Sequence, residues 1–596
     1  MIVKWLQRAK QVWTNYWEEQ GRERKAKPVR ESSPLVMKGL PKKPTYFFFG
    51  LYTVALLGLF ARCFYLQIID TDFLQRQGEN RFARTLAIET VRGEILDRNG
   101  VVLASTLPLR TIAADPTVMG RVKEEDLRKL AQILEIPYTT IRHKLDHPSS
   151  PKYVVLARGQ SIARSDQVRA LRIKGIQIEN FVRRVYPDGP VMSHVVGFTG
   201  NNGHGQEGVE LAQDDVLMGQ KGERRVIKDR YGRIVEDLWE KEANRGNDVT
   251  LAIDSRIQFI VYQALQRAME RTEAKNASAV VADVRTGEIL SLVNLPTYDP
   301  NNRLTMQFDL VRNRVMTDQF EPGSTMKPFA IAKALDRKIV TPMTTIQTAP
   351  GKLKIGDRII GDVHDYGLLT VAEIVSMSSN IGTAKIALEI RPQRLWNTYT
   401  QLGFGQAVNL GFPGATSGRL RPAKSWRPIE QATISYGHGV TVSLIQLVRA
   451  YTALARDGEV IDLTLYKRRA DEIVRKKQVF SPEVARSVRA MMMNTVKRGG
   501  TASNVKIDGY TVAAKTGTAN KVKNGRYVND VVASIVGIVP ATQPRFIVAV
   551  MIDEPKRGSH FGGRAAGPVF NAVAAGALRT LMVPPDQNVA RVQATK

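Results

Sequence analysis

The sequence predicts a mixed α/β (α+β) protein with one membrane-spanning helix and an antiparallel sheet covered by helices. Three observations predict this fold class. Residues 45–61 form an uncharged apolar run. The C-terminal half alternates helix-period segments with short apolar runs that are joined by turns. Finally, 43% of the 596 residues are hydrophobic, which is enough to build a core.

Composition limits the function. Lys and Arg number 86 against 57 Asp and Glu, a net charge of +29, which favours anionic partners such as nucleic acid, membrane or cell wall. A single cysteine, Cys63, excludes a disulfide framework, a cysteine zinc site and an iron–sulfur cluster. No HExxH motif or close pair of histidines occurs either, so a histidine-based metal site is not expected. The prediction for cofactors is none.

Residues 45–69 are predicted to span the membrane. At a rise of ~1.5 Å per residue, Arg62 lies roughly 24 Å along the helix from Tyr46, near the far interface, where arginine can snorkel. The preceding residues 1–44 hold 11 Lys/Arg and four Glu, which predicts that this tail stays in the cytoplasm and the rest lies outside.

Three other interpretations of this run are less favourable. A cleaved signal peptide would be shorter and would end in a small-x-small site. Lipidation of Cys63 would require a small preceding residue, and Arg62 stands there. A buried helix of a soluble protein is the third interpretation.

A nucleic-acid role would need a basic module with aromatic residues in the cytosol, for which the short tail is a poor candidate.

The part predicted to lie outside has two regions. Residues 70–245, called the pedestal below, are charged, rich in turns and mixed α/β, without a cluster that resembles an active site. Residues 246–583 form the second predicted domain, and residues 584–596 a flexible tail.

The second domain follows a regular order. A helix is predicted over 254–269, a strand–turn–strand unit over 279–292, strands over 532–539 and 546–552, and a last helix over 568–581. Hairpins among helices indicate an antiparallel sheet that the helices cover.

The first chemical motif is Ser324-Thr325-Met326-Lys327. It follows a Pro-Gly turn and precedes a helical pattern, so Ser324 is expected at a helix N-terminus with Lys327 on the same face. A neutral lysine there could take the serine proton and make the hydroxyl a nucleophile. Alone the tetrad is weak evidence, because a solvated helix face explains it and two chance matches occur, at 149–152 and 503–506.

The second motif is Ser378-Ser379-Asn380, 54 residues after Ser324. Ser378 could relay a proton to a leaving group, and Asn380 could orient an amide and hold Lys327. The plainer alternative is a cap for the helix that follows.

The third motif is Lys515-Thr516-Gly517-Thr518, 137 residues after Ser378. Lys515 and the two threonine hydroxyls could hold a carboxylate, and Gly517 would let a substrate approach the backbone. An exposed strand edge here could pair with an extended peptide. The alternative is an ordinary hairpin strand.

The three motifs in this order are far more specific than each alone. With them, the chain resembles a class B penicillin-binding protein, a peptidoglycan D,D-transpeptidase. Residues 92–100 and 205–210 resemble two pedestal motifs of that family, and segments 321–324, 411–414 and 427–439 resemble its septal, FtsI-type branch. The elongation-type branch shares much of the sequence of these segments and remains an alternative.

The resemblance implies a helix-covered five-stranded antiparallel sheet and a set of roles. Ser324 attacks the stem peptide, Lys327 is the base, and Ser378 and Asn380 assist. Lys515, Thr516 and Thr518 hold the terminal carboxylate, and Gly517 belongs to the same substrate-binding motif. The expected partners are a D-Ala-D-Ala donor peptide, an amine acceptor, β-lactams, a membrane glycan polymerase (FtsW-type) and other division proteins.

Alternatives can be separated by sequence. A class A β-lactamase would need a Glu-x-x-Leu-Asn segment between Asn380 and Lys515, and none occurs. A bifunctional enzyme would need glycosyltransferase motifs, and a β-lactam sensor would need further membrane or cytosolic modules. A scaffold without chemistry is a third kind of function. Two side chains have no assigned role: His438, where relatives commonly have an aromatic residue, and Phe561, which could line the site.

Overall fold

The computed structural model describes residues 42–71, 83–88, 90–228 and 234–587. It forms two units, residues 1–86 with 225–239 and residues 87–224 with 240–596, and each is treated by itself. Most of the predicted cytoplasmic tail, and the C-terminal tail from residue 588, lie outside the described residues. The domain boundaries given above therefore stay predictions.

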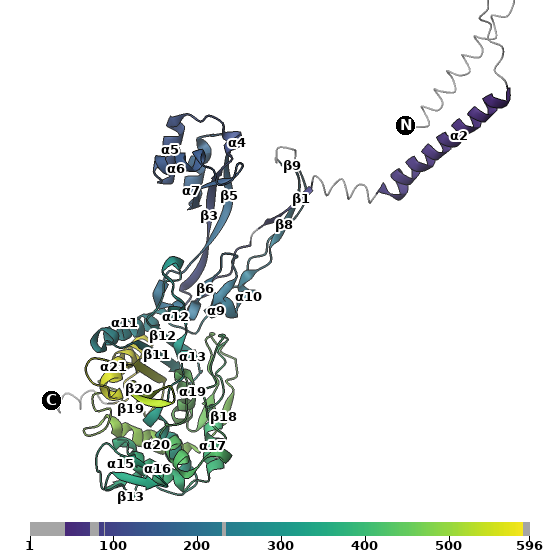
Figure 1. Ribbon diagram of the computed structural model, residues 1–596. Helices are drawn as coiled ribbons and strands as arrows, with labels where there is room; N and C mark the ends of the chain where they lie inside the picture. Colours follow the sequence, from purple (N-terminus) through teal and green to yellow (C-terminus); the bar gives the residue numbers. More distant parts are fainter. Residues whose placement is uncertain (1–41, 72–82, 89, 229–233, 588–596) are drawn as a thin grey trace, which may run out of the picture. The chain divides into compact units, whose positions relative to one another are not determined.

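The N-terminal apolar run forms one long helix. Helix α2 (Lys42–Phe64), drawn in purple in Figure 1, continues into a π-helical turn, η1 (Tyr65–Ile69). Its Tyr46–Ile69 stretch of 24 residues is apolar and long enough to cross a membrane, and none of it is buried by protein. The helix of a soluble core would be covered, so a membrane anchor fits this segment better.

The pedestal is built on a long strand, β3 (Val102–Ala114). It pairs antiparallel with β5 (Ile176–Val185) over ten residues and with β4 (Val154–Gln160) at its far end. A small core lies between this sheet and three helices, α5 (Glu124–Leu134), α6 (Tyr138–Asp146) and α7 (Ile162–Ala170). The shorter pedestal elements are β2 (Ile95–Leu96), α4 (Pro116–Met119), α8 (Ser193–Val196), β6 (Phe198–Thr199), β7 (Gly205–Glu207), α9 (Gly208–Ala212) and α10 (Asp214–Met218). Strand β10 (Val249–Thr250), just after the pedestal, pairs with β2.

A separate three-stranded sheet has the order β1 (Ala83–Ile88), β8 (Gly222–Lys228) and β9 (Ile234–Lys241).

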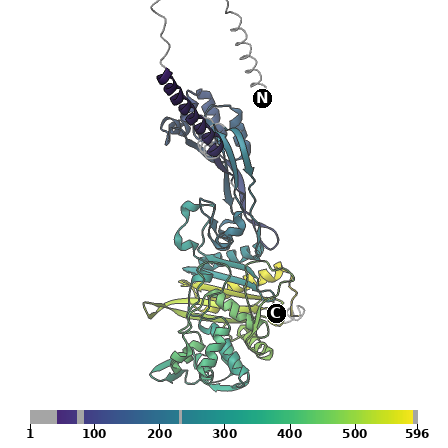
Figure 2. The ribbon, with the colours of Figure 1, turned by 90° about the vertical axis from the view of Figure 1, so that its right-hand side faces the viewer.

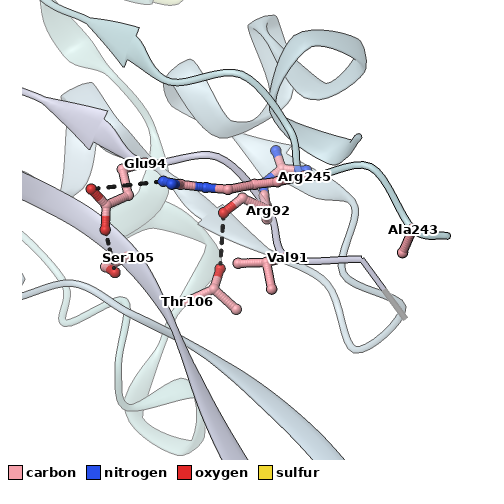
Figure 3. A pocket seen from close by; sticks show the side chains of 7 residues that line it. All are labelled: Val91, Arg92, Glu94, Ser105, Thr106, Ala243 and Arg245. Atoms are coloured by element: carbon pink, nitrogen blue, oxygen red, sulfur yellow. Dashed lines mark hydrogen bonds and ion pairs between the residues drawn. The ribbon is translucent and has the colours of Figure 1, made fainter. Parts of the chain in front are cut away.

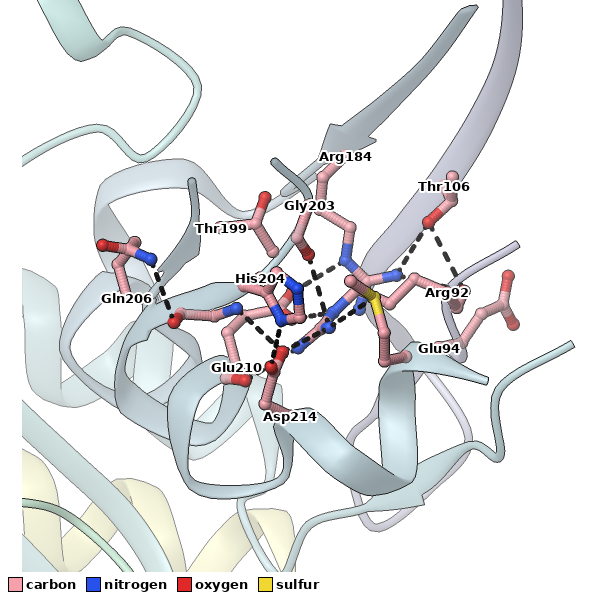
Figure 4. A network of polar contacts seen from close by, with 12 residues as sticks. Arg92, Glu94, Thr106, Arg184, Thr199, Gly203, His204, Gln206, Glu210 and Asp214 are labelled. Carbon is pink, nitrogen blue, oxygen red and sulfur yellow. Dashed lines mark hydrogen bonds and ion pairs between the residues drawn. The ribbon is translucent and has the colours of Figure 1, made fainter. Parts of the chain in front are cut away.

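A buried charge network joins the two segments that resemble pedestal motifs (Figure 4). The Arg92 guanidinium donates to Glu210 at 2.6 Å and to Asp214 at 2.6 Å, while Arg184 donates to the second Glu210 oxygen at 2.7 Å. His204 lies 2.7 Å from Asp214. Because Glu210 is completely buried, removal of either arginine would leave its charge undercompensated. The network therefore stabilises the base of the pedestal.

A cavity of about 350 Å³ adjoins this network (Figure 3). It is lined by Val91, Arg92, Glu94, Ser105, Thr106, Ala243 and Arg245. Arg245 lies across it toward Glu94, which accepts a hydrogen bond from Ser105 at 2.9 Å. None of the residues of the three chemical motifs lines it.

The second domain contains the predicted five-stranded antiparallel sheet. Its strand order is β12 (Ile289–Leu295), β11 (Asn276–Asp283), β21 (Phe546–Asp553), β20 (Arg526–Val539) and β19 (Ala513–Lys523). Every residue of β11 and β21 is buried, and so is β20 from Val531 onward, as expected for a sheet covered on both faces. The fold class is thus confirmed.

Helices cover both faces of this sheet (Figures 1 and 2). On one face lie α11 (Ser255–Thr272) and α21 (Gly562–Thr580), which share a core with the sheet. The larger core on the other face includes α14 (Lys327–Asp336), α19 (Leu444–Ala455) and α20 (Pro482–Met493). The remaining helices are α12 (Phe308–Val311), α13 (Arg314–Thr317), α15 (Val371–Met377), α16 (Asn380–Leu388), α17 (Pro392–Gln401) and α18 (Pro428–Ser435).

Short strand pairs complete the domain: β13 (Thr345–Gln347) with β16 (Leu368–Thr370), β14 (Lys352–Ile355) with β15 (Arg358–Gly361), and β17 (Glu459–Ile461) with β18 (Lys476–Gln478).

The predicted start of the last helix at Pro568 is wrong. Helix α21 begins at Gly562, and Pro568 lies inside it. Proline is favoured in the first turn of a helix, which suggested a start there. Packing of the small-residue face of α21 on the sheet outweighs the loss of one backbone donor.

Candidate active site

The first motif forms a tight turn that leads into a buried helix. Ser324 is half-buried in a 3₁₀ turn, η4 (Gly323–Met326), and α14 begins at Lys327, which is completely buried. The buried Tyr451 hydroxyl donates to the Thr325 carbonyl at 2.9 Å, and this hydrogen bond stabilises the turn. Ser324 therefore lies at the entrance of a helix, as the sequence predicted.

Ser378 lies between the two lysines. The Lys327 ammonium donates to the Ser378 carbonyl and lies 3.1 Å from Ser378 Oγ, and Lys515 Nζ lies 2.8 Å from the same Oγ. A hydroxyl oxygen has two lone pairs and one proton. When both lysines donate, that proton is the only group the Ser378 hydroxyl still offers to a substrate.

Burial makes both lysines unusual bases. Burial, followed by the nearby Lys515 charge, holds the pKa of Lys327 well below its usual value, and Asp362 opposes the shift. Burial also lowers the pKa of Lys515, to about 7. Burial and the Lys515 charge thus favour the neutral amine at Lys327, while Lys515 keeps a cationic fraction up to about its pKa of 7.

An acidic residue outside the motifs orders the second one. Asp362, just after β15, accepts from Ser379 Oγ at 2.5 Å, from the Asn380 N–H at 2.5 Å and from the Ile381 N–H at 3.1 Å. Its carboxylate thereby caps the N-terminus of α16, where an anion is favourable. Asn380 Nδ2 donates to the Gly361 carbonyl at 2.9 Å. The sequence suggested that Asn380 holds Lys327, but the Lys327 side chain donates to Ser378 in the structure.

Ser378 itself adopts a left-handed conformation, φ 65°. This backbone between α15 and α16 turns its carbonyl and hydroxyl toward Lys327. Such a conformation is uncommon for a residue other than glycine and often marks a functional site. The sequence left a helix cap and a chemical role open for this motif. The structure shows the cap at Ser379, and it places Ser378 in contact with both lysines.

The third motif lies on the edge strand of the sheet. Strand β19 pairs only with β20 among the described strands, so its outer edge is available for an extended peptide. A side chain on Gly517 would come within 2.8 Å of the Pro322 carbonyl and 2.6 Å of Ser534 Oγ, which explains why glycine stands there. The Thr518 hydroxyl accepts from the Gly562 N–H at 3.0 Å.

The structure brings all three motifs together. Lys327, Ser378 and Lys515 are in hydrogen-bond contact, and Gly323 lies against the Thr518 carbonyl.

The structure also shows where the two side chains without an assigned role lie. The His438 ring packs between Tyr436 and Tyr527, with centroids at 5.3 and 6.0 Å, and burial with the Lys327 charge lowers the pKa of His438 to about 4.

Phe561 is 58% exposed at the start of α21. Sequence reasoning missed Asp362, Glu321 and Tyr527, because each acts through a contact between distant segments that no local pattern reveals.

Comparisons with known proteins agree with this site. Residues 277–575 match the family "Penicillin binding protein transpeptidase domain", and residues 87–251 match "Penicillin-binding Protein dimerisation domain". The chain is 38% identical to peptidoglycan D,D-transpeptidase FtsI of Escherichia coli K12, over 90% of this chain and 92% of that one. It is 40% identical to a probable peptidoglycan D,D-transpeptidase PenA of Neisseria meningitidis, over 90% and 93%.

Solved structures are similar too. The transpeptidase domain of penicillin-binding protein 3 from Burkholderia pseudomallei is 48% identical, with a TM-score of 0.53, and covers 57% of this chain and 98% of that one. A peptidoglycan synthetase from Bifidobacterium adolescentis is 25% identical, with a TM-score of 0.68, and covers 85% and 98%. The chain belongs to the class B penicillin-binding proteins, the serine-type peptidoglycan D,D-transpeptidases.

Proposed function

We propose that Ser324 carries the acyl-transfer chemistry of this transpeptidase and that the chain serves septal wall synthesis in cell division. The observation that supports the chemistry is the contact of Lys327, Ser378 and Lys515 beside the turn that holds Ser324. The segments that resemble the septal branch, together with the FtsI relative, support the cellular role.

The proposed reaction has two steps. Neutral Lys327 takes the Ser324 proton, and Oγ forms a bond to the penultimate D-Ala carbonyl carbon. The peptide C–N bond breaks, and the leaving D-Ala nitrogen receives a proton from the Ser378 hydroxyl, which Lys327 replenishes. The amine of a second stem peptide then attacks the ester, forms the cross-link and returns the proton to Ser324.

The remaining motif residues hold the donor peptide. Lys515, Thr516 and Thr518 bind its terminal carboxylate, and Gly517 lets the peptide approach the backbone of the β19 edge. The N–H groups of Ser324 and Thr518 stabilise the oxyanion. β-Lactams mimic the D-Ala-D-Ala end and acylate Ser324.

The proposed location follows from α2 and the charge of the tail. The 11 Lys/Arg of residues 1–44 favour a cytoplasmic N-terminus, which places the pedestal and the catalytic domain outside the inner membrane. There the pedestal would contact an FtsW-type glycan polymerase and other division proteins. We also propose domain boundaries at 44/45, 69/70, 245/246 and 583/584.

Covalent labelling of the full chain by a fluorescent penicillin tests the chemistry. The natural sequence is expected to label rapidly and retain the label for hours, and Ser324→Ala is expected not to label at all. Rapid turnover of the penicillin would instead indicate a β-lactamase. In cells, a Ser324→Ala chain that still supports division would favour the scaffold alternative, and a requirement for growth of the side wall would favour the elongation-type one.

A second prediction concerns pH. The second-order rate constant for acylation by a penicillin is expected to fall as pH rises through about 7, because Lys515 loses the proton that attracts the carboxylate. Arginine stays charged, so Lys515→Arg should move this alkaline limb to higher pH even if it lowers the maximum rate. Stopped-flow acylation between pH 5 and 10 measures both profiles, and an unshifted limb in the variant would contradict the role of Lys515.

A further inference from the structure

The strands β19 and β20 extend well beyond the third motif. Tyr527 pairs with Val522, four residues past Thr518, which at ~3.4 Å per residue is roughly 14 Å further along the strand. In Figure 2 these yellow-green strand ends extend past the rest of the sheet. Residues 522–527 are all exposed, so little apolar packing holds this hairpin tip in place.

One side chain ties the tip to the nucleophile turn. The Tyr527 hydroxyl lies 3.2 and 3.1 Å from the two carboxylate oxygens of Glu321, which stands three residues before Ser324. Burial and the Glu321 charge raise the pKa of Tyr527 to about 12, so the phenol keeps its proton and donates. Among residues 524–529, which the structure describes in full, this is the only side-chain hydrogen bond to a residue outside the hairpin.

The same carboxylate also holds a third segment. Glu321 accepts from the Gly439 N–H at 2.8 Å, and the backbones at 320 and 442 are paired beside it. The ring of His438, the residue before Gly439, packs against Tyr527 and lies close enough to Lys327 for the Lys327 charge to act on it. Glu321 thus connects the nucleophile turn, the His438 segment and the hairpin tip.

We propose that Glu321 is a positioning residue that clasps the hairpin tip through Tyr527, and that the resulting wall of Tyr527 and His438 shields the Ser324 ester from water. A transpeptidase must exclude water until an amine arrives, because either one breaks the same ester carbon–oxygen bond. A fixed wall beside the nucleophile favours the amine by limiting access of solvent. The proposal rests on the acyl-enzyme proposed above.

The test uses the full chain in detergent with Tyr527→Phe, Glu321→Ala and the double variant. Tyr527→Phe keeps the ring that packs on His438 and removes only the donor. Loss of one solvent-accessible hydrogen bond to a carboxylate is expected to raise the hydrolysis rate of the penicillin adduct and the hydrogen exchange of residues 522–528 by about threefold to tenfold. The double variant should not exceed Glu321→Ala, because both changes remove the same bond.

A matched control lies in the pedestal. Tyr153 donates to Glu179 at 2.7 Å in a similar exposed pair, so Tyr153→Phe should change neither readout. Unchanged exchange and adduct lifetime in Tyr527→Phe would overturn the clasp. If the natural sequence never labels, the proposed chemistry fails instead, and the exchange of the hairpin still decides whether the clasp exists.

Discussion

Lys327→Met is expected to slow acylation by penicillin by a factor of about 10² to 10⁴, the usual contribution of a positioned general base. The side chain is completely buried and in contact with Ser378. The other lysine that contacts this hydroxyl, Lys515, is proposed to hold the substrate carboxylate instead. Methionine preserves most of the volume, which limits damage to the core that surrounds α14.

The pH dependence gives a sharper test of the same residue. The reactive form is the neutral amine, so acylation should rise with pH through the pKa of Lys327, which burial and Lys515 hold well below its usual value. Lys515→Met removes one cause of that shift, so the rising limb should move to higher pH.

Lys333→Met is the matched control. It lies on the same helix, and its ammonium pairs with Asp336 at 2.9 Å, away from the motifs. Stopped-flow acylation and thermal unfolding are measured for the natural chain, Lys327→Met and Lys333→Met. Together they separate loss of the base from loss of the fold. Near-normal acylation of Lys327→Met would refute its role.

Asp362→Ala is expected to reduce acylation by about 10²-fold without touching a reacting group, since a displacement of about 1 Å in a catalytic group can cost that much. Asp362 binds Ser379 and the first N–H groups of α16, and this fixes the backbone from which Ser378 reaches Lys327 and Lys515. Without the carboxylate, three donors lose their acceptor and the second motif is free to shift.

Two variants define this effect. Asp362→Asn keeps one acceptor oxygen and should retain more activity than Asp362→Ala, while Asp365→Ala, three residues away in the same exposed loop, should match the natural chain. Rates of acylation and the hydrogen exchange of residues 378–383 report chemistry and order separately. Full activity with increased exchange would show that the cap serves stability alone.

Much of the architecture could be predicted because local patterns encode it. Apolar spacing located α11, the alternation around the turn at 285–288 located β11 and β12, and the uncharged run located α2. Three motifs with fixed internal spacing indicated the site residues, since serine, lysine and threonine in those positions have few other uses as a set. The start of α21 could not be predicted, because tertiary packing outweighed the preference of Pro568.

The sequence by itself determined the fold class, the candidate anchor and the identity of the chemical groups, since periodicity, run length and motif spacing are local properties of the chain. Only the tertiary structure decided how those groups act. Burial is a property of the packed domain, and it sets the pKa values of Lys327 and Lys515. Two contacts join segments that are far apart in the chain: Asp362 with Ser379 and Glu321 with Tyr527. Such contacts leave no local pattern in the sequence, so only the folded structure shows them.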